Sequence, residues 1–247
     1  MSPTAKPQSN YITTTYQQRT FCAAVTFAEG IESQNIVGYQ TKSLSAGFSL
    51  SAPTFLDVGK ANMDLQNFKL GANAAGDGTE MIQFLNEEGQ CPEMWIWLNS
   101  NSDMEEGWYD FETWEPITQT IFPGVGYLMN VSAAVDMLVS GQVKSGNTTV
   151  TLTAGFSVFG NNTPTDIDLQ SIKLGANAAG DGTEMIQFLN EEGQCPEMWI
   201  WLNSNSDMEE GWYDFETWEP INYTVKAGEA FLLNVTADVE MTIPAAL

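Results

Sequence analysis

One segment of this sequence occurs twice without a single difference. Residues 69–117 match residues 173–221 letter for letter. The identity stops abruptly at Ile117 and Ile221, which indicates recent copying of a gene segment rather than functional constraint on every position in the segment. Self-similarity at a fixed distance is typical of chains built from repeated structural units. Whatever unit the first copy belongs to, the chain must therefore fold it twice.

Weaker similarity surrounds the identical segment and sets the size of the repeated unit. The flanking residues align in pairs, 47–66 with 155–170 and 118–143 with 222–247. We therefore predict two homologous domains, at residues 35–143 and 144–247, because each has about the 100 residues that a single domain needs. Residues 1–34 have no counterpart and form an N-terminal extension.

Short apolar runs between turn signals recur along both repeats, and helical periodicity is weak. This pattern is typical of an all-β sandwich or barrel. We predict two tandem β-sandwich domains of the jelly-roll or immunoglobulin-like kind, with a turn at Glu87–Gln90. Met94–Leu98 is apolar on both faces and predicts a central strand. Strands are expected near residues 36–44, 47–52, 67–70, 80–86, 93–99, 107–113, 118–122, 126–131 and 134–140, and again from about residue 148.

The N-terminal extension also contains strand-forming sequence. Apolar residues alternate along it, and YITTTY is rich in β-formers. No local hairpin partner is apparent, so the strand either pairs with its own first domain or inserts into a neighbouring subunit. The residues that would make these contacts are Tyr11, Ile12, Phe21, Val25 and Phe27.

Composition excludes several classes of function. The chain has no histidine, which excludes Ser-His-Asp and Cys-His catalysis and histidine-ligated metals. The formal net charge is -24, with 8 Lys plus Arg against 32 Asp plus Glu, so nucleic acid and anionic membrane surfaces are not expected partners. No glycine-rich phosphate loop is present, and no two carboxylates are marked out for glycoside hydrolysis. We therefore do not expect an enzyme.

The ends and the cysteines bear on the compartment. No apolar run is long enough for a transmembrane helix, and the N-terminus lacks an apolar signal core. The chain is therefore either not secreted by that route or a mature form. The chain has three cysteines, Cys22, Cys91 and Cys195, which are far apart in the sequence. An odd number of widely spaced cysteines predicts buried or half-buried thiols rather than a disulfide framework.

Most of the negative charge lies in the two identical segments. Each contains a loop with oxygen-bearing side chains at alternate positions, a spacing that calcium loops use. The candidate ligands are Asn99, Asn101, Asp103 and Glu105, with Asn203, Asn205, Asp207 and Glu209 in the second copy. Met104 stands where an EF-hand needs glycine, so a solvated acidic surface remains the alternative. Gly76–Glu80 is a second acidic turn with the same two interpretations.

All eight tryptophans also lie in the identical segments. Exposed aromatic rings beside carboxylates are a common way to hold sugar rings, and the alternative is that the rings form the core. The candidate platform consists of Trp108, Trp114, Trp212 and Trp218.

The order GFS, IQFLN, MWIWL, GWYDF and PGVGYLMNV resembles tandem β-sandwich repeats of bacterial secreted or cell-surface proteins whose function is unassigned. The resemblance covers most of the chain but contains no diagnostic motif. It implies an extracellular structural or adhesive role, and it carries no catalytic residues.

Two functions fit these observations. The first is a structural subunit of a surface assembly or filament, joined by strand donation or by head-to-tail contacts between similar domains. The second is a carbohydrate-binding or adhesin module that uses exposed tryptophans, with or without calcium. In an assembly the acidic patches would recur and repel one another, so calcium or salt is expected to stabilise it.

Overall fold

The protein is all-β, as the sequence predicts. The computed structural model describes the backbone of residues 10–16, 19–25, 27–28 and 31–32, and both backbone and side chains of residues 37–86, 88–100, 103–190, 192–195, 197–204 and 208–245. These residues form antiparallel sheets and two single-turn 3-10 helices, Leu65–Asn67 and Leu169–Ser171. No helix in this described part is long and apolar enough to cross a membrane.

The first repeat forms two five-stranded sheets and a small two-stranded one. The larger sheets have the orders β1-β2-β5-β14-β8 and β11-β10-β9-β13-β6, and β12 pairs with β7. The N-terminal extension supplies two strands of the first sheet, β1 (Asn10–Tyr16) and β2 (Arg19–Val25). The strands within the repeat are β5 (Val37–Leu44), β6 (Gly47–Ser51), β7 (Met63–Asp64), β8 (Lys69–Leu70), β9 (Asp77–Phe84), β10 (Glu93–Leu98), β11 (Gly107–Asp110), β12 (Thr120–Ile121), β13 (Tyr127–Val131) and β14 (Val135–Gln142).

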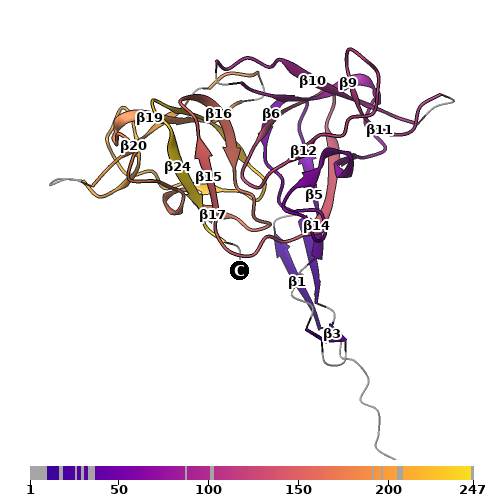
Figure 1. Ribbon diagram of the computed structural model, residues 1–247, viewed down its shortest axis with the longest axis horizontal. Helices are drawn as coiled ribbons and strands as arrows, with labels where there is room; N and C mark the ends of the chain where they lie inside the picture. Colours follow the sequence, from indigo (N-terminus) through magenta and orange to yellow (C-terminus); the bar gives the residue numbers. More distant parts are fainter. Residues whose placement is uncertain are drawn as a thin grey trace, which may run out of the picture.

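The second repeat has the same arrangement without the two N-terminal strands. Its sheets have the orders β15-β24-β18, β16-β23-β19-β20-β21 and β17-β22, and the two repeats lie side by side (Figure 1). Its strands are β15 (Thr148–Leu152), β16 (Gly155–Gly160), β17 (Ile167–Asp168), β18 (Lys173–Leu174), β19 (Asp181–Gln187), β20 (Met198–Leu202), β21 (Gly211–Asp214), β22 (Thr224–Val225), β23 (Ala230–Val235) and β24 (Val239–Ile243).

The core of each repeat lies between its two main sheets. Along β14, buried and exposed residues alternate over Val135–Ser140, because successive side chains of a strand point to opposite faces. Trp95 and Trp97 of β10 belong to the core, whereas Ile96 packs in a smaller apolar cluster with Tyr109. Strand β10 is thus apolar on both faces and lies between β9 and β11, as its sequence predicts.

The N-terminal extension forms a hairpin that the sequence did not reveal, and through β2 it pairs with the first repeat, which is one of the two predicted alternatives. Strand β1 (Asn10–Tyr16) pairs with β2 (Arg19–Val25), with Tyr16 opposite Arg19. The two glutamines between the strands are not the Asn-Gly or Asp-Gly that signals a tight hairpin, which is why the sequence does not reveal it.

The hairpin is joined to the first repeat through one edge. Backbone pairs Cys22–Tyr39, Ala23–Gly38 and Ala24–Val37 connect β2 to β5. Beyond it, β3 (Phe27–Ala28) pairs with β4 (Ile31–Glu32). The hairpin extends away from the body of the molecule (Figure 1). The five residues predicted to make assembly contacts lie in β1, β2 and β3, and their side chains are outside the described part of the chain.

The two repeats contact each other reciprocally. The Ala52 N–H donates to the Gly228 carbonyl at 3.0 Å, and the aligned Gly160 N–H donates to the Gly124 carbonyl at 3.1 Å. Each repeat therefore uses the same surface to bind the other, with an approximate two-fold relation. This contact is not the head-to-tail one that could propagate from chain to chain, because a reciprocal contact closes on itself.

Apolar side chains seal the reciprocal contact. Leu50 and Ala52 of the first repeat cluster with Val158 and Ala230 of the second. Phe48 and Phe156, at aligned positions, each lie against a glycine of the opposite repeat, Gly193 and Gly89 respectively. Small residues thus let the two backbones approach closely.

Gly126 provides a test of this contact. Its N–H donates to the Val158 carbonyl at 2.7 Å, and a β-carbon on it would lie 2.5 Å from Val158 Cγ1. Gly126→Val should therefore force the repeats apart and lower the free energy of unfolding by about 1–3 kcal/mol, the usual cost of overpacking. Chemical denaturation followed by tryptophan fluorescence measures the change. Ala133→Val, at an exposed position of the same repeat, is the control and should be neutral. Equal stability of both variants would contradict this description of the contact.

Candidate functional site

An exposed aromatic loop follows β11 and is repeated after β21. Residues 111–114 connect Asp110 to Glu115, whose carbonyl accepts the Asp110 N–H at 3.0 Å. The Asp110 carboxylate caps the loop by accepting from the Thr113 N–H at 2.8 Å, the Thr113 hydroxyl at 3.0 Å and the Glu112 N–H at 3.0 Å. These bonds to Thr113 and Glu112 hold the Asp110 pKa below its ordinary value. We name residues 110–115 and 214–219 the aromatic turns.

Each aromatic turn holds a tryptophan in a backbone conformation that suits glycine. The φ angle is 60° at Trp114 and 61° at Trp218, and among described residues other than glycine these two have positive φ. The left-handed region costs an L-residue about 1–2 kcal/mol, and for a bulky residue it is an outlier. The Trp114 ring is nevertheless 51% exposed and Phe111, three residues earlier, is 48% exposed. Such strain at an exposed aromatic is typical of functional positions.

The other two predicted platform residues are not on the surface, and that part of the prediction is wrong. Trp108 and Trp212 are fully buried. Their indole Nε1–H groups donate to the carbonyls of Phe68 at 2.8 Å and Ile172 at 2.9 Å. Strand alternation explains the placement, since β11 points Trp108 into the core beside Trp97, at 5.3 Å between ring centroids.

The first residue of each candidate calcium loop, Asn99 or Asn203, hydrogen-bonds to protein groups. Asn99 Oδ1 accepts the Trp97 indole N–H at 3.1 Å, and its amide nitrogen donates to the carbonyls of Ala74 at 3.3 Å and Ala75 at 3.2 Å. Asn203 makes the equivalent contacts from Trp201. Both side chains therefore fasten neighbouring loops, and the prediction that they are metal ligands is not supported.

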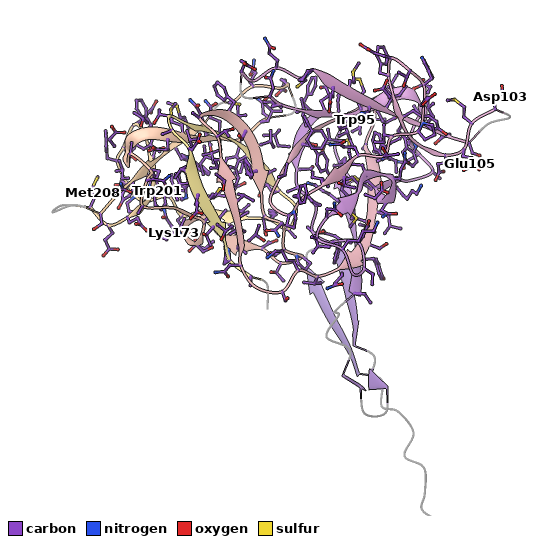
Figure 2. The ribbon with its side chains drawn as sticks, in the orientation of Figure 1. Trp95, Asp103, Glu105, Lys173, Trp201 and Met208 are labelled. Atoms are coloured by element: carbon purple, nitrogen blue, oxygen red, sulfur yellow. The ribbon has the colours of Figure 1, made fainter. Side chains whose placement is uncertain are left out.

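The remaining predicted ligands that the structure describes, Asp103, Glu105 and Glu209, are not grouped as a metal site requires. Asp103 and Glu105 are exposed and lie toward the outer end of their loop (Figure 2). Glu209 is exposed as well, and Asn101, Asn205 and Asp207 lie outside the described residues. Across the described part of the chain, no three Asp, Glu, Cys or His side chains are grouped as a metal site requires. Met104 packs beside the apolar cluster of Ile96 and Tyr109, which accounts for a methionine where an EF-hand has glycine.

The second acidic turn is a structural clamp. Glu80 is buried, and its two carboxylate oxygens accept the N–H groups of Ala75 at 2.9 Å and Gly76 at 3.0 Å. The Ser132 hydroxyl donates to the same carboxylate at 3.2 Å. Glu184 repeats the backbone contacts in the second copy. A buried carboxylate satisfied in this way stabilises its loop and needs no cation.

The two cysteines whose side chains are described lack the features of nucleophiles. Cys91 and Cys195 are free and half-buried, and burial raises the pKa of both thiols. A reactive thiol needs the opposite shift. Cys22 lies in β2, where side chains are not described.

A cleft that the sequence does not reveal lies where the two repeats meet. It has a volume of about 600 Å³ and is lined by residues of both repeats. Lys42 and Phe48 come from the first repeat, and Tyr223, Lys226 and Glu229 from the second. We name it the interrepeat cleft.

Hydrogen bonds hold the polar groups of the interrepeat cleft in place. Lys42 Nζ donates to Ser51 Oγ and to the Gly228 carbonyl, both at 2.7 Å, and so links the two repeats. The Tyr223 hydroxyl donates to Glu229 Oε1 at 2.7 Å, and Glu229 Oε2 accepts the Lys226 N–H at 2.8 Å. Burial and the Glu229 carboxylate raise the pKa of Tyr223, which keeps its hydroxyl protonated.

The signal that could have located the cleft lies in the divergent part of the repeats. Tyr223, Lys226 and Glu229 stand where the first repeat has Gln119, Phe122 and Val125. Aligning the repeats to find identical residues does not identify these positions, because their residues differ between the two copies.

No protein-family model, curated protein or solved structure matches this chain. The class of protein is therefore defined by its all-β fold and by the geometry above.

The strain at the aromatic turn can be measured by comparing two substitutions. Trp114→Gly and Trp114→Ala both remove the ring, but glycine adopts positive φ freely. The glycine variant should therefore be more stable than the alanine variant by about 1 kcal/mol in denaturant unfolding. Glu112 is the matched control, since its φ is not positive and alanine should be the better residue there. An alanine variant as stable as the glycine variant at position 114 would remove the argument for strain.

Proposed function

We propose that this chain is a structural subunit of an extracellular assembly and has no enzymatic activity. Its two repeats are tandem β-sandwich domains, at residues 35–143 and 144–247, and residues 1–34 link one subunit to the next by strand donation. The resemblance to repeats of cell-surface proteins agrees with this role.

The observation that carries the proposal is the position of the N-terminal hairpin. Strand β1 is the end strand of its sheet, and no other described strand pairs with its outer edge. An exposed edge presents a row of N–H and C=O groups that can pair with a strand of another chain. The hairpin also extends from the body (Figure 1), so a second subunit has access to it.

Charge also favours contact between the extension and another copy. Residues 1–28 contain Lys6 and Arg19 and no Asp or Glu, whereas the chain as a whole has a net charge of -24. Copies of the body repel one another, whereas residues 1–28 carry positive side chains only. Electrostatic complementarity of this kind directs association and suppresses other contacts.

The reciprocal contact between the repeats strengthens the case for the extension. Because each repeat already covers the matching surface of the other, that surface is not free to join a further subunit. Growth of an assembly must then depend on a different segment. The hairpin, like the β3–β4 pair that follows it, has no equivalent among the described strands of the second repeat.

Truncation tests the proposal. A chain lacking residues 1–28 should be a folded monomer, while the full chain forms larger species in sedimentation velocity and negative-stain micrographs. Ile12→Pro together with Thr13→Pro is a second variant, since proline cannot donate a backbone hydrogen bond and would disable the β1 edge without removing the extension. Assembly that survives both changes, or a full chain that stays monomeric, would overturn strand donation.

A second candidate function is carbohydrate binding through the aromatic turns, and the left-handed tryptophans favour it. The exposed rings of Trp114 and Phe111 present flat apolar faces against which the C–H face of a sugar ring can pack. Exposed carboxylates of Glu112 and Glu115 adjoin them and can accept hydrogen bonds from sugar hydroxyls.

A glycan array tests this candidate directly. The full chain should bind a restricted set of glycans, and if the aromatic turns hold the glycan, the double variant Trp114→Ala with Trp218→Ala should lose at least ten-fold in signal. Running the array with calcium and with a chelator shows whether calcium contributes. An array without signal in both conditions would exclude the carbohydrate-binding function.

A further inference from the structure

We infer that the interrepeat cleft is a binding site for a neutral saccharide, one per chain. The inference rests on the second candidate function, carbohydrate binding, and moves its principal site from the aromatic turns to the cleft. Three observations support the inference. They are the size of the cleft, the residues that line it, and the different residues at the matching position on the other side of the molecule.

The interrepeat cleft has the dimensions and position of a small-ligand site. Its volume of about 600 Å³ lies within the range of about 300–1,000 Å³ that such sites occupy. Sites of this kind occur preferentially where two structural units meet. Here both repeats contribute, because Lys42 and Phe48 belong to the first and Tyr223 to the second.

Aromatic rings supply the apolar part of the lining. Phe48, Phe188 and Tyr223 line the cleft and are each half-buried, so part of each ring remains available. The Phe188 and Tyr223 rings are in contact, with centroids 4.9 Å apart and planes at 49°. Rings set at an angle form a corner rather than a flat slot. A sugar ring, which has apolar C–H faces and polar edges, suits such a corner.

The charged groups of the lining select a neutral ligand rich in hydroxyls. Lys42 and Lys226 are opposed by Glu192 and Glu229, so the four side chains sum to no net charge. An anionic ligand would meet the two carboxylates, and a cationic one would meet the two ammonium groups. A hydroxyl both donates and accepts, and therefore satisfies either kind of group.

Ser49 adds a polar atom with unused capacity. It lines the cleft, and its buried Oγ has no hydrogen-bond partner among the described residues. A buried hydroxyl without a partner costs free energy. A ligand hydroxyl within reach of Ser49 Oγ would supply the missing partner.

The matching position across the approximate two-fold axis has a different lining. Three of the aligned residues, Phe122, Pro123 and Val150, border a cavity of about 470 Å³ whose other lining residues, Lys144 among them, have no counterpart in the interrepeat cleft. Phe122 and Val150 stand where the interrepeat cleft has Lys226 and Lys42, and Val125 aligns with Glu229. The balanced set of charges is therefore present on one side only. The aromatic turns, in contrast, are identical in the two repeats.

Because the balanced charges occur on one side only, the number of saccharide molecules bound per chain tests the inference. Titration calorimetry on the full chain, with cellohexaose, maltohexaose, xylohexaose and chitohexaose as probes, should show saturable binding of at least one probe at one site per chain. Binding through the aromatic turns would instead give two equal sites. An oligogalacturonate serves as the anionic probe and should not bind.

Matched variants assign the site. Glu192→Gln with Lys226→Gln changes two exposed residues of the interrepeat cleft and should weaken binding at least ten-fold. Glu88→Gln with Phe122→Gln makes the changes at the aligned positions of the first repeat and should leave the affinity unchanged. Thermal unfolding of both variants verifies that they fold.

The outcomes separate the inference from the function on which it rests. Binding at two sites that is abolished by Trp114→Ala with Trp218→Ala, and unaffected by the cleft variant, overturns the cleft and keeps carbohydrate binding. Binding confined to the oligogalacturonate overturns the argument from charge. Absence of binding by every probe overturns both the cleft and the carbohydrate-binding function.

Discussion

In each repeat, two tryptophans are buried in the core, and the indole N–H of each must find a hydrogen-bond acceptor there. Trp97 and Trp108 pack edge to face in the core, and neither can leave its N–H unpaired without cost. Trp108 donates to the Phe68 carbonyl, while Trp97 donates to Asn99, which in turn holds the loop at Ala74 and Ala75. Glu80 fastens that loop from its other side. Asn99 and Glu80, which resemble metal ligands in the sequence, thus support the loop beside the two tryptophans.

This requirement for an acceptor explains how far the sequence could predict the structure. Period-two alternation and turn residues located most strands, because side-chain direction in a strand follows from position alone. They could not separate Trp108 from Trp114, since both lie in one aromatic run and the difference is a left-handed backbone angle that no residue type announces. Asn99 was misassigned for a related reason. Its amide oxygen can bind calcium or an indole, and only the folded chain decides which.

The identical segments and the divergent ones contribute differently to the molecule. Residues 69–117 and 173–221 give two copies of one core and one aromatic turn, so everything that they encode occurs twice. The segments that follow them differ, and they supply Tyr223, Lys226 and Glu229 to one side of the junction between the repeats. Similarity between the repeats therefore maintains the fold, and difference between them creates a feature that occurs once.

The reciprocal contact also bears on how such a chain could originate. A surface that binds its own duplicate is self-complementary, so a shorter ancestor with a single repeat would already have formed a symmetric dimer. Two identical protomers must have identical clefts on both sides of their axis, and any substitution appears in both. Joining the two genes removes that restriction, because each half then mutates independently. The unequal clefts of this chain are an outcome that covalent linkage permits and exact symmetry forbids.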